Sequence, residues 1–271
     1  MLAAADFGQL QTARGKQSVM STGSLEHNSN PLEDYWEAAR RPLVSLVFLL
    51  PLLVIYEYGV LVHAATAPEL IRNGADNWMR SHLQSMGLGH ALLLPAIVVA
   101  GLMIWHCVGG YSWRIERDML LGMCAESLLF AFLLIIAGQL QDLAFQQLNW
   151  NTLNWNTLST EPETTRVITY LGAGIYEEFL FRLCLLPLLF GCLRLVRIPQ
   201  LQAALLAVLV TGLGFSAAHH IGPAAEQIQL FTFTFRALAG CFFAALFYFR
   251  GFGITVGCHA AYDLLVGVIL V

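Results

Sequence analysis

Most of the sequence after residue 42 consists of seven apolar runs, at residues 43–63, 90–109, 119–138, 167–191, 200–219, 229–249 and 254–271. A helix needs about 20 apolar residues to cross the hydrocarbon core of a bilayer. Only helices and closed barrels satisfy all of their backbone hydrogen bonds in that core. The runs therefore predict an all-α fold, a polytopic membrane helix bundle of about seven transmembrane helices, within a range of six to eight.

The composition agrees with a membrane protein and excludes one large class of partner. Hydrophobic residues make up 57% of the 271 residues and charged residues 12%, and the mean hydropathy is +0.64. The net charge is −4, and Lys and Arg form no cluster after the N-terminal region. Nucleic-acid binding is excluded, because it needs a basic surface. The six cysteines lie in or beside apolar runs without a CxxC pair, which favours buried thiols over disulfides or a thiolate zinc site.

The sequence before the fourth run divides into two parts. Residues 1–30 mix Gly, Ser, Gln and Asn without a long apolar core, so we expect a disordered tail and not a cleaved signal peptide. Residues 31–164 are expected to form a short interfacial helix at 31–41 and the first three transmembrane helices. A polar connection at 139–166 follows, and its near-repeat LNWNTLNWNTL places tryptophans that suit the lipid–water interface.

Basic residues outside the apolar runs predict the orientation in the membrane. If seven helices alternate, one side carries nine of them: Arg14, Lys16, Arg40, Arg41, Arg114, Arg117, Arg194, Arg197 and Arg250. The other side carries three: Arg72, Arg80 and Arg166. Cytoplasmic loops carry the excess of Lys and Arg. We therefore expect a multi-pass protein of a plasma membrane, the inner membrane of a bacterium, with its N-terminus in the cytoplasm.

The fourth run contains three charged residues within six positions, Glu177, Glu178 and Arg182. Each would cost roughly 2.5–3.5 kcal/mol at the centre of a membrane helix unless it is paired or wetted. Glu178 and Arg182 are four residues apart in the order that favours a helical ion pair. Glu177 has no such partner, whereas Gly172 and Gly174 one turn earlier allow another helix to approach. Glu177 is therefore a candidate functional residue.

Three more ionisable side chains lie at apolar-run positions on two later helices. His219 ends the segment FSAAHH, and His259 and Asp263 share one helix face four residues apart. Other intramembrane charge is limited to Glu57, Glu126 and Arg236, whose roles the sequence does not indicate. Together with Glu177, these groups predict one polar cavity shared by three helices. By the expected spans their depths differ, so tilted spans or a longer fifth helix are needed to bring them level.

This set of side chains predicts hydrolytic chemistry. A glutamate beside a histidine can take a proton from water, and an imidazole N–H can stabilise the oxyanion formed when that water attacks an amide. The same four groups, Glu177, His219, His259 and Asp263, could instead bind Zn²⁺, because imidazole and carboxylate are ordinary zinc ligands. We favour the metal-free site. A serine mechanism is weaker, because no serine lies in a nucleophile-elbow context.

Three short motifs carry a resemblance to a known family. EEFLFR at 177–182 resembles the EExxxR signature, FSAAH at 215–219 resembles FxxxH, and HAAYD at 259–263 resembles HxxxN/D of the CPBP family. This family comprises type II CAAX prenyl endopeptidases and bacteriocin-processing or abortive-infection proteins. The motifs occur in the family's order on successive helices, and the resemblance covers about residues 165–271. It implies that these residues form a CPBP-like catalytic membrane core.

The resemblance implies an intramembrane endopeptidase acting on a membrane-associated protein or peptide. By position, Glu177 and His219 would activate water, and His259 with Asp263 would form the oxyanion side. Glu178 and Arg182 would support the site. The family has been described both as metalloproteases and as metal-free glutamate proteases. This chain has Asp263 where prenyl proteases commonly have Asn, and an ionised Asp cannot donate a hydrogen bond to an oxyanion.

Two other classes of protein fit the same composition. A transporter would also need intramembrane charges, but its typical inverted repeats or paired broken helices are not seen in this sequence. A non-catalytic scaffold or immunity protein could share the fold, since a fold does not determine function. The presence of every motif position favours the protease. The sequence does not indicate an oligomeric state, a prenylated substrate or any other particular substrate.

Overall fold

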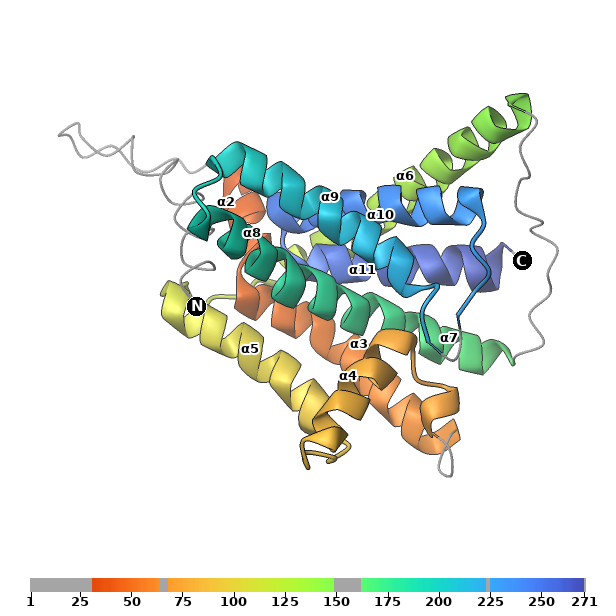
Figure 1. Ribbon diagram of the computed structural model, residues 1–271. Helices are drawn as coiled ribbons and strands as arrows, with labels where there is room; N and C mark the ends of the chain where they lie inside the picture. Colours follow the sequence, from red (N-terminus) through yellow and green to blue (C-terminus); the bar gives the residue numbers. More distant parts are fainter. Residues whose placement is uncertain (1–30, 64–67, 149–161, 223–224, 271) are drawn as a thin grey trace.

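The computed structural model describes residues 31–63, 68–148, 162–222 and 225–270, and all regular elements in these ranges are helices (Figure 1). Five helices are long and apolar enough to cross a membrane: α3 (Pro42–His63), α6 (Arg117–Gln147), α9 (Gln200–Ala218), α10 (Leu230–Arg250), and α11 (Phe252–Leu264) with its π-helical extension η5 (Leu265–Ile269). The all-α fold class predicted from the sequence is confirmed.

The other two predicted runs are also helical. Residues 90–109 contain α5 (Leu93–Gly109), a shorter apolar helix. Residues 163–195 are helical without a break, as α7 (Glu163–Gly172), the π-helical segments η3 (Ala173–Glu177) and η4 (Phe179–Leu185), and α8 (Leu186–Leu195). The described part of the chain is thus a polytopic bundle, and each apolar run predicted from the sequence contributes a helix to it.

Several smaller helices accompany the bundle. The short helix predicted at 31–41 is present as α2 (Pro31–Ala39). Between α3 and α5 the chain forms the 3₁₀-helix η2 (Pro68–Leu70) and α4 (Gly74–Ser85), which the hydropathy pattern did not predict because both are polar. The predictions for residues 1–30 and for residues 149–158 of the near-repeat concern parts of the chain outside the described residues.

The predicted polar connection at 139–166 begins too early, because α6 continues to Gln147. Its added turns are polar in sequence but have partners on α10. Gln141 donates hydrogen bonds to the Phe231 carbonyl at 3.0 Å and to the Thr234 hydroxyl at 2.9 Å, and the Phe145 and Phe231 rings meet edge to face. Contacts with a neighbouring helix therefore extend α6 beyond its apolar stretch.

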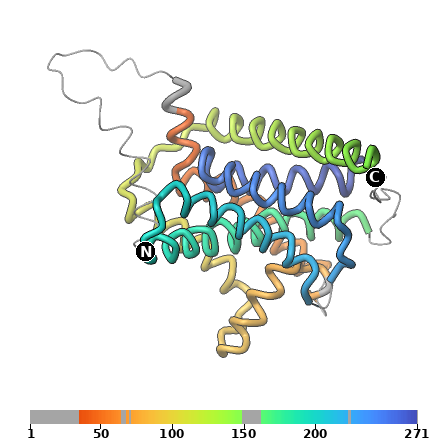
Figure 2. Tube along the Cα trace, turned by 45° about the horizontal axis from the view of Figure 1, so that its top comes forward, coloured from red at the N-terminus to blue at the C-terminus, as the bar shows by residue number. Residues whose placement is uncertain are grey.

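Helix α11 lies in the interior of the bundle. All of its residues from Phe252 to Ala260 are buried, and it packs against α3, α6, α10 and η3. Figure 2 shows α6 along one side of the bundle and α4 on the opposite side. Close approach at two helix contacts depends on glycine: a Cβ on Gly174 would lie 2.9 Å from the backbone nitrogen of Ala260, and one on Gly212 would lie 3.0 Å from the Ala237 carbonyl.

The remaining intramembrane charges are paired, and the pair of Arg250 with Glu126 joins α10 to α6. Arg250 makes bidentate contacts to Glu126 at 2.7–2.9 Å, and its guanidinium lies 4.1 Å from the ring centroid of Trp36 on α2. Arg236 makes a bidentate contact to Glu226.

All six cysteines are free thiols. The prediction that they are buried is wrong for four of them, which are exposed: Cys107, Cys124, Cys184 and Cys192. Cys258 is buried and Cys241 is partly buried.

Candidate active site

The two adjacent glutamates lie where the helix 163–195 departs from α-helical hydrogen bonding. Glu177 ends the π-helical segment η3, and η4 begins at Phe179, directly after Glu178. π-Helical turns are rare and frequently occur at functional sites. Gly174 in η3 lets the backbone of α11 come close at Ala260. His259 precedes Ala260 in α11, so both glutamates lie beside it.

Glu178 has two partners inside the protein. Its Oε2 lies 2.9 Å from Arg182 Nε, which confirms the predicted ion pair, and its Oε1 lies 2.7 Å from His259 Nδ1. Glu178 and Arg182 are 0% and 1% exposed, so the pair is shielded from solvent and lipid. Arg182 also donates to the Gly240 carbonyl at 3.1 Å. Glu178 thus links an ion pair to one ring nitrogen of His259.

Glu177 faces both histidines. Its Oε2 lies 3.8 Å from His219 Nε2 and 3.9 Å from His259 Nε2, and it has no hydrogen-bond partner among the described residues. His219 follows the last residue of α9, and His259 lies midway along α11. The different depths expected from the sequence are reconciled by the packing of these helices, because the three side chains converge on one point.

The second ring nitrogen of each histidine is occupied. His219 Nδ1 lies 2.8 Å from the Phe215 carbonyl. A carbonyl only accepts hydrogen bonds, so this nitrogen carries hydrogen, and Nε2 of the neutral ring has a lone pair directed at Glu177. His259 Nδ1 similarly donates to Glu178, while the ring stacks on Phe243 with centroids 4.6 Å apart. Both imidazoles are therefore fixed in orientation and present Nε2 to Glu177.

Asp263 lies at the same side of His259 as Glu177. Its Oδ2 is 3.4 Å from His259 Nε2, the nitrogen that also faces Glu177. The sequence pattern placed Asp263 and His259 on one helix face, and this contact agrees with that placement. The other ring nitrogen, Nδ1, donates its hydrogen bond to Glu178. Glu178 therefore contacts one of the catalytic candidates directly, which its predicted pairing with Arg182 did not indicate.

These groups open on a cavity of about 430 Å³. Its polar lining includes Asn73, Glu177, His219, Glu226, Arg236, His259 and Asp263, and its apolar lining includes Phe215, Phe231, Phe235, Phe243 and Tyr262. A larger cavity of about 1080 Å³ lies beside α4, and Gly74 lines both cavities. The smaller cavity is the one that holds the charged residues predicted from the motifs.

One contact at the site comes from a residue that the sequence analysis did not consider. Asn73 donates a hydrogen bond of 2.7 Å from its side-chain amide to Glu177 Oε1. It lies in the polar segment before α4, 104 positions from Glu177. Asn is a common N-cap residue, so Asn73 could have indicated the start of α4 in the sequence. No sequence pattern links Asn73 to Glu177.

The side chains around Glu177 are of the types that can also bind a metal ion. Among the described residues no group of three or more His, Cys, Asp or Glu side chains is arranged to hold a metal ion. The chemistry that the arrangement does offer is that of a carboxylate beside two imidazole nitrogens, in a cavity that also has apolar walls. Such a group can accept a proton from water.

Comparison with known families agrees with the three motifs. The family model described as type II CAAX prenyl endopeptidase Rce1-like matches residues 163–265, a range that includes Glu177, His219, His259 and Asp263. The match confirms the family resemblance and supports a CAAX-type intramembrane protease domain in this part of the chain. No curated protein and no solved structure matched the chain.

Proposed function

We propose that the chain is an intramembrane endopeptidase that hydrolyses a peptide bond of a membrane-associated protein or peptide. The observation that carries this proposal is the position of Glu177 Oε2, a buried carboxylate oxygen without a hydrogen-bond partner among the described residues, facing two histidine nitrogens. Both nitrogens are less than 4 Å from it, so one water molecule placed to the side of either pair can contact both atoms. The Rce1-like match at 163–265 supports the same reaction class.

In the proposed reaction Glu177 is the general base. A water molecule between Glu177 and His219 donates one hydrogen to Oε2 and the other to Nε2 of the imidazole. As the water oxygen bonds to the carbonyl carbon of the substrate, its proton passes to Glu177 and the C=O electron pair moves to the oxygen. The C–N bond then breaks, and Glu177 gives the proton to the leaving amine, so that one water is consumed for each bond hydrolysed.

His259 is proposed to stabilise the oxyanion. In its doubly protonated form Nδ1–H donates to Glu178 and Nε2–H is available to the substrate oxygen. Glu178 and Asp263 supply the negative charge that a buried, protonated ring needs. Asp263 then acts through His259 and makes no hydrogen bond to the oxyanion.

No step of this proposal passes through a metal. Zn²⁺ remains the alternative for the same protease, with Glu177, His219, His259 and Asp263 as its ligands. Those four side chains are donor types that zinc accepts. Zinc analysis of the purified protein distinguishes the two versions.

The proposal is tested by purifying the chain in detergent and incubating it with membrane-associated peptides, with cleavage products identified by mass spectrometry. Glu177→Gln keeps the side-chain shape and can still accept the Asn73 hydrogen bond, but it cannot take a proton from water. We expect the wild type to cleave and Glu177→Gln to lose at least about 100-fold in kcat while melting at a similar temperature. Absence of turnover by a folded wild type would favour a scaffold or a transporter.

A further inference from the structure

The side chain of Asn73, the residue before α4, makes two hydrogen bonds to different parts of the protein. Asn73 is the N-cap of α4, and its side-chain oxygen accepts from the Asp76 backbone N–H at 3.0 Å. Its side-chain amide donates to Glu177 Oε1 at 2.7 Å. Asn73 is 5% exposed and Glu177 is 8% exposed. One buried amide therefore joins the start of α4 to the carboxylate of the candidate general base.

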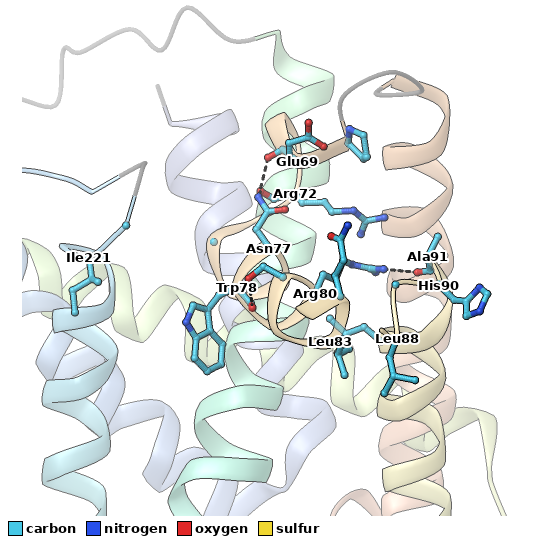
Figure 3. Close-up of a pocket in the computed structure, with 17 residues that line it drawn as sticks. Glu69, Arg72, Asn77, Trp78, Arg80, Leu83, Leu88, His90, Ala91 and Ile221 are labelled. Carbon is cyan, nitrogen blue, oxygen red and sulfur yellow. Dashed lines mark hydrogen bonds between the residues drawn. The ribbon is translucent and has the colours of Figure 1, made fainter. Parts of the chain in front are cut away.

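A largely buried group of four charges fixes α4 against the bundle. Arg72 lies 2.6 Å from Asp76 and 3.3 Å from Glu57, and Arg80 lies 2.5 Å from Asp76 and 2.7 Å from Glu57. The two positive charges equal the two negative charges, and each guanidinium group is paired with both acids of the group. Arg80 also donates to the Ala91 carbonyl before α5, a contact drawn in Figure 3. The segment that carries Asn73 is thus attached to α3 and to the start of α5.

The same unit contacts two consecutive residues of η3. Tyr176 donates a hydrogen bond of 2.5 Å to Glu57, and Glu177 accepts from Asn73. Asn73 is uncharged, so it holds one oxygen of Glu177 and leaves the carboxylate negatively charged. An arginine in its place would neutralise that charge. With Oε1 occupied by Asn73, Oε2 is left pointing between the two histidines.

We propose that Asn73 is the positioning residue of the protease site: it fixes the rotamer of Glu177 so that Oε2 faces the attacking water, and the four-charge group on α3 and α4 keeps Asn73 in place. This inference rests on the proposed function, because it assigns Asn73 a role in that reaction. Asn73 does not touch the substrate carbonyl or the water in the scheme above. Its loss is expected to misplace the base, and a misplacement of about 1 Å can cost roughly 100-fold in rate.

The test must separate this role from helix capping. Asn73→Ser retains a good N-cap side chain but is too short to reach Glu177 in the same way. Asn77→Ser is the matched control, because Asn77 lies on the same helix and donates only to the backbone carbonyls of Glu69 and Arg72. The contact of Asn77 with Glu69 is drawn in Figure 3.

We expect Asn73→Ser to lower kcat by about 10- to 100-fold and to change KM by less than about three-fold, because substrate binding is retained while the base is misplaced. Asn77→Ser should leave kcat within about two-fold of the wild type. A kcat for Asn73→Ser as high as that of the control would overturn the inference even though the wild type cleaves.

A second measurement needs no activity. Melting temperature is compared for the wild type, Asn73→Ser, Glu177→Ala and the double variant. We expect Asn73→Ser to lower Tm by about 3–6 °C in the wild-type background and by clearly less when Glu177 is already Ala. Equal losses in both backgrounds would show that Asn73 acts only as a cap and would refute the inference. An inactive wild type would overturn the proposed function, and the melting data would still decide whether Asn73 holds Glu177.

Discussion

Replacement of Glu178 by Gln removes the charge that neutralises Arg182 while leaving an oxygen that can still accept from His259 Nδ1. In the structure the two charged atoms are 2.9 Å apart and both side chains are at most 2% exposed. Loss of one partner from a buried pair typically costs about 3–5 kcal/mol, because the other charge stays uncompensated. The variant is therefore expected to be destabilised even though its shape is nearly unchanged.

The expected magnitude is at the lower end of that range, because Arg182 keeps other contacts. Its guanidinium carbon lies 4.8 Å from the ring centroid of Phe215 and 5.4 Å from that of Phe243, within the distance of cation–π attraction. It also keeps the hydrogen bond to the Gly240 carbonyl. We expect a loss of about 3 kcal/mol in the free energy of unfolding, which is roughly 100-fold in the equilibrium constant.

The assay is detergent-driven unfolding of the purified protein, followed by tryptophan fluorescence, for the wild type and three variants. These are Glu178→Gln, Arg182→Met, and the double variant, in which no buried charge is left unpaired. The double variant should be more stable than Glu178→Gln by about 2 kcal/mol or more. A loss below about 1 kcal/mol for Glu178→Gln, or strict additivity in the double variant, would refute the reasoning.

Three further predictions concern metal, packing and orientation. Asp263→Asn should keep activity within about ten-fold of the wild type and chelators should not inactivate the protein, because Asn can still contact His259; stoichiometric zinc with an inactive variant would contradict the metal-free mechanism. Gly174→Ala should reduce activity by at least about ten-fold, because its Cβ would lie 2.9 Å from the backbone of α11, whereas Gly101→Ala, which has nothing within 4 Å, should be neutral in the same assay. Topology reporters fused after Arg117 and Arg197 should both report the cytoplasm, and either one reporting the opposite side would overturn the orientation.

The fold class could be predicted from the sequence because the membrane limits the solutions. Every backbone group in the hydrocarbon core must be bonded within the segment, so an apolar run of sufficient length has to be a helix. Each predicted run is a helix in the described residues. Helix ends were less predictable: α6 continues past its apolar stretch because Gln141 and Phe145 have partners on α10.

The pairing of Glu178 with Arg182 could also be predicted, because both residues lie on one helix and the helical repeat alone sets their distance. The same argument gave the shared face of His259 and Asp263. It could not show which carboxylate fixes His259 Nδ1, because Glu178 lies on a different helix, 81 positions away. The π-helical turns at the site carry no hydropathy signal and were not predicted.

By itself, the sequence determined the helical bundle, the candidate residues Glu177 and His219, and the local ion pair, since lipid burial and helical periodicity act over short stretches of chain. Only the tertiary structure decided that Oε2 of Glu177 faces two imidazole nitrogens and that Asn73 holds its other oxygen. These contacts join segments about 40 to 100 residues apart. Their geometry is set by how closely helices pack, which depends on side chains from both partners at once.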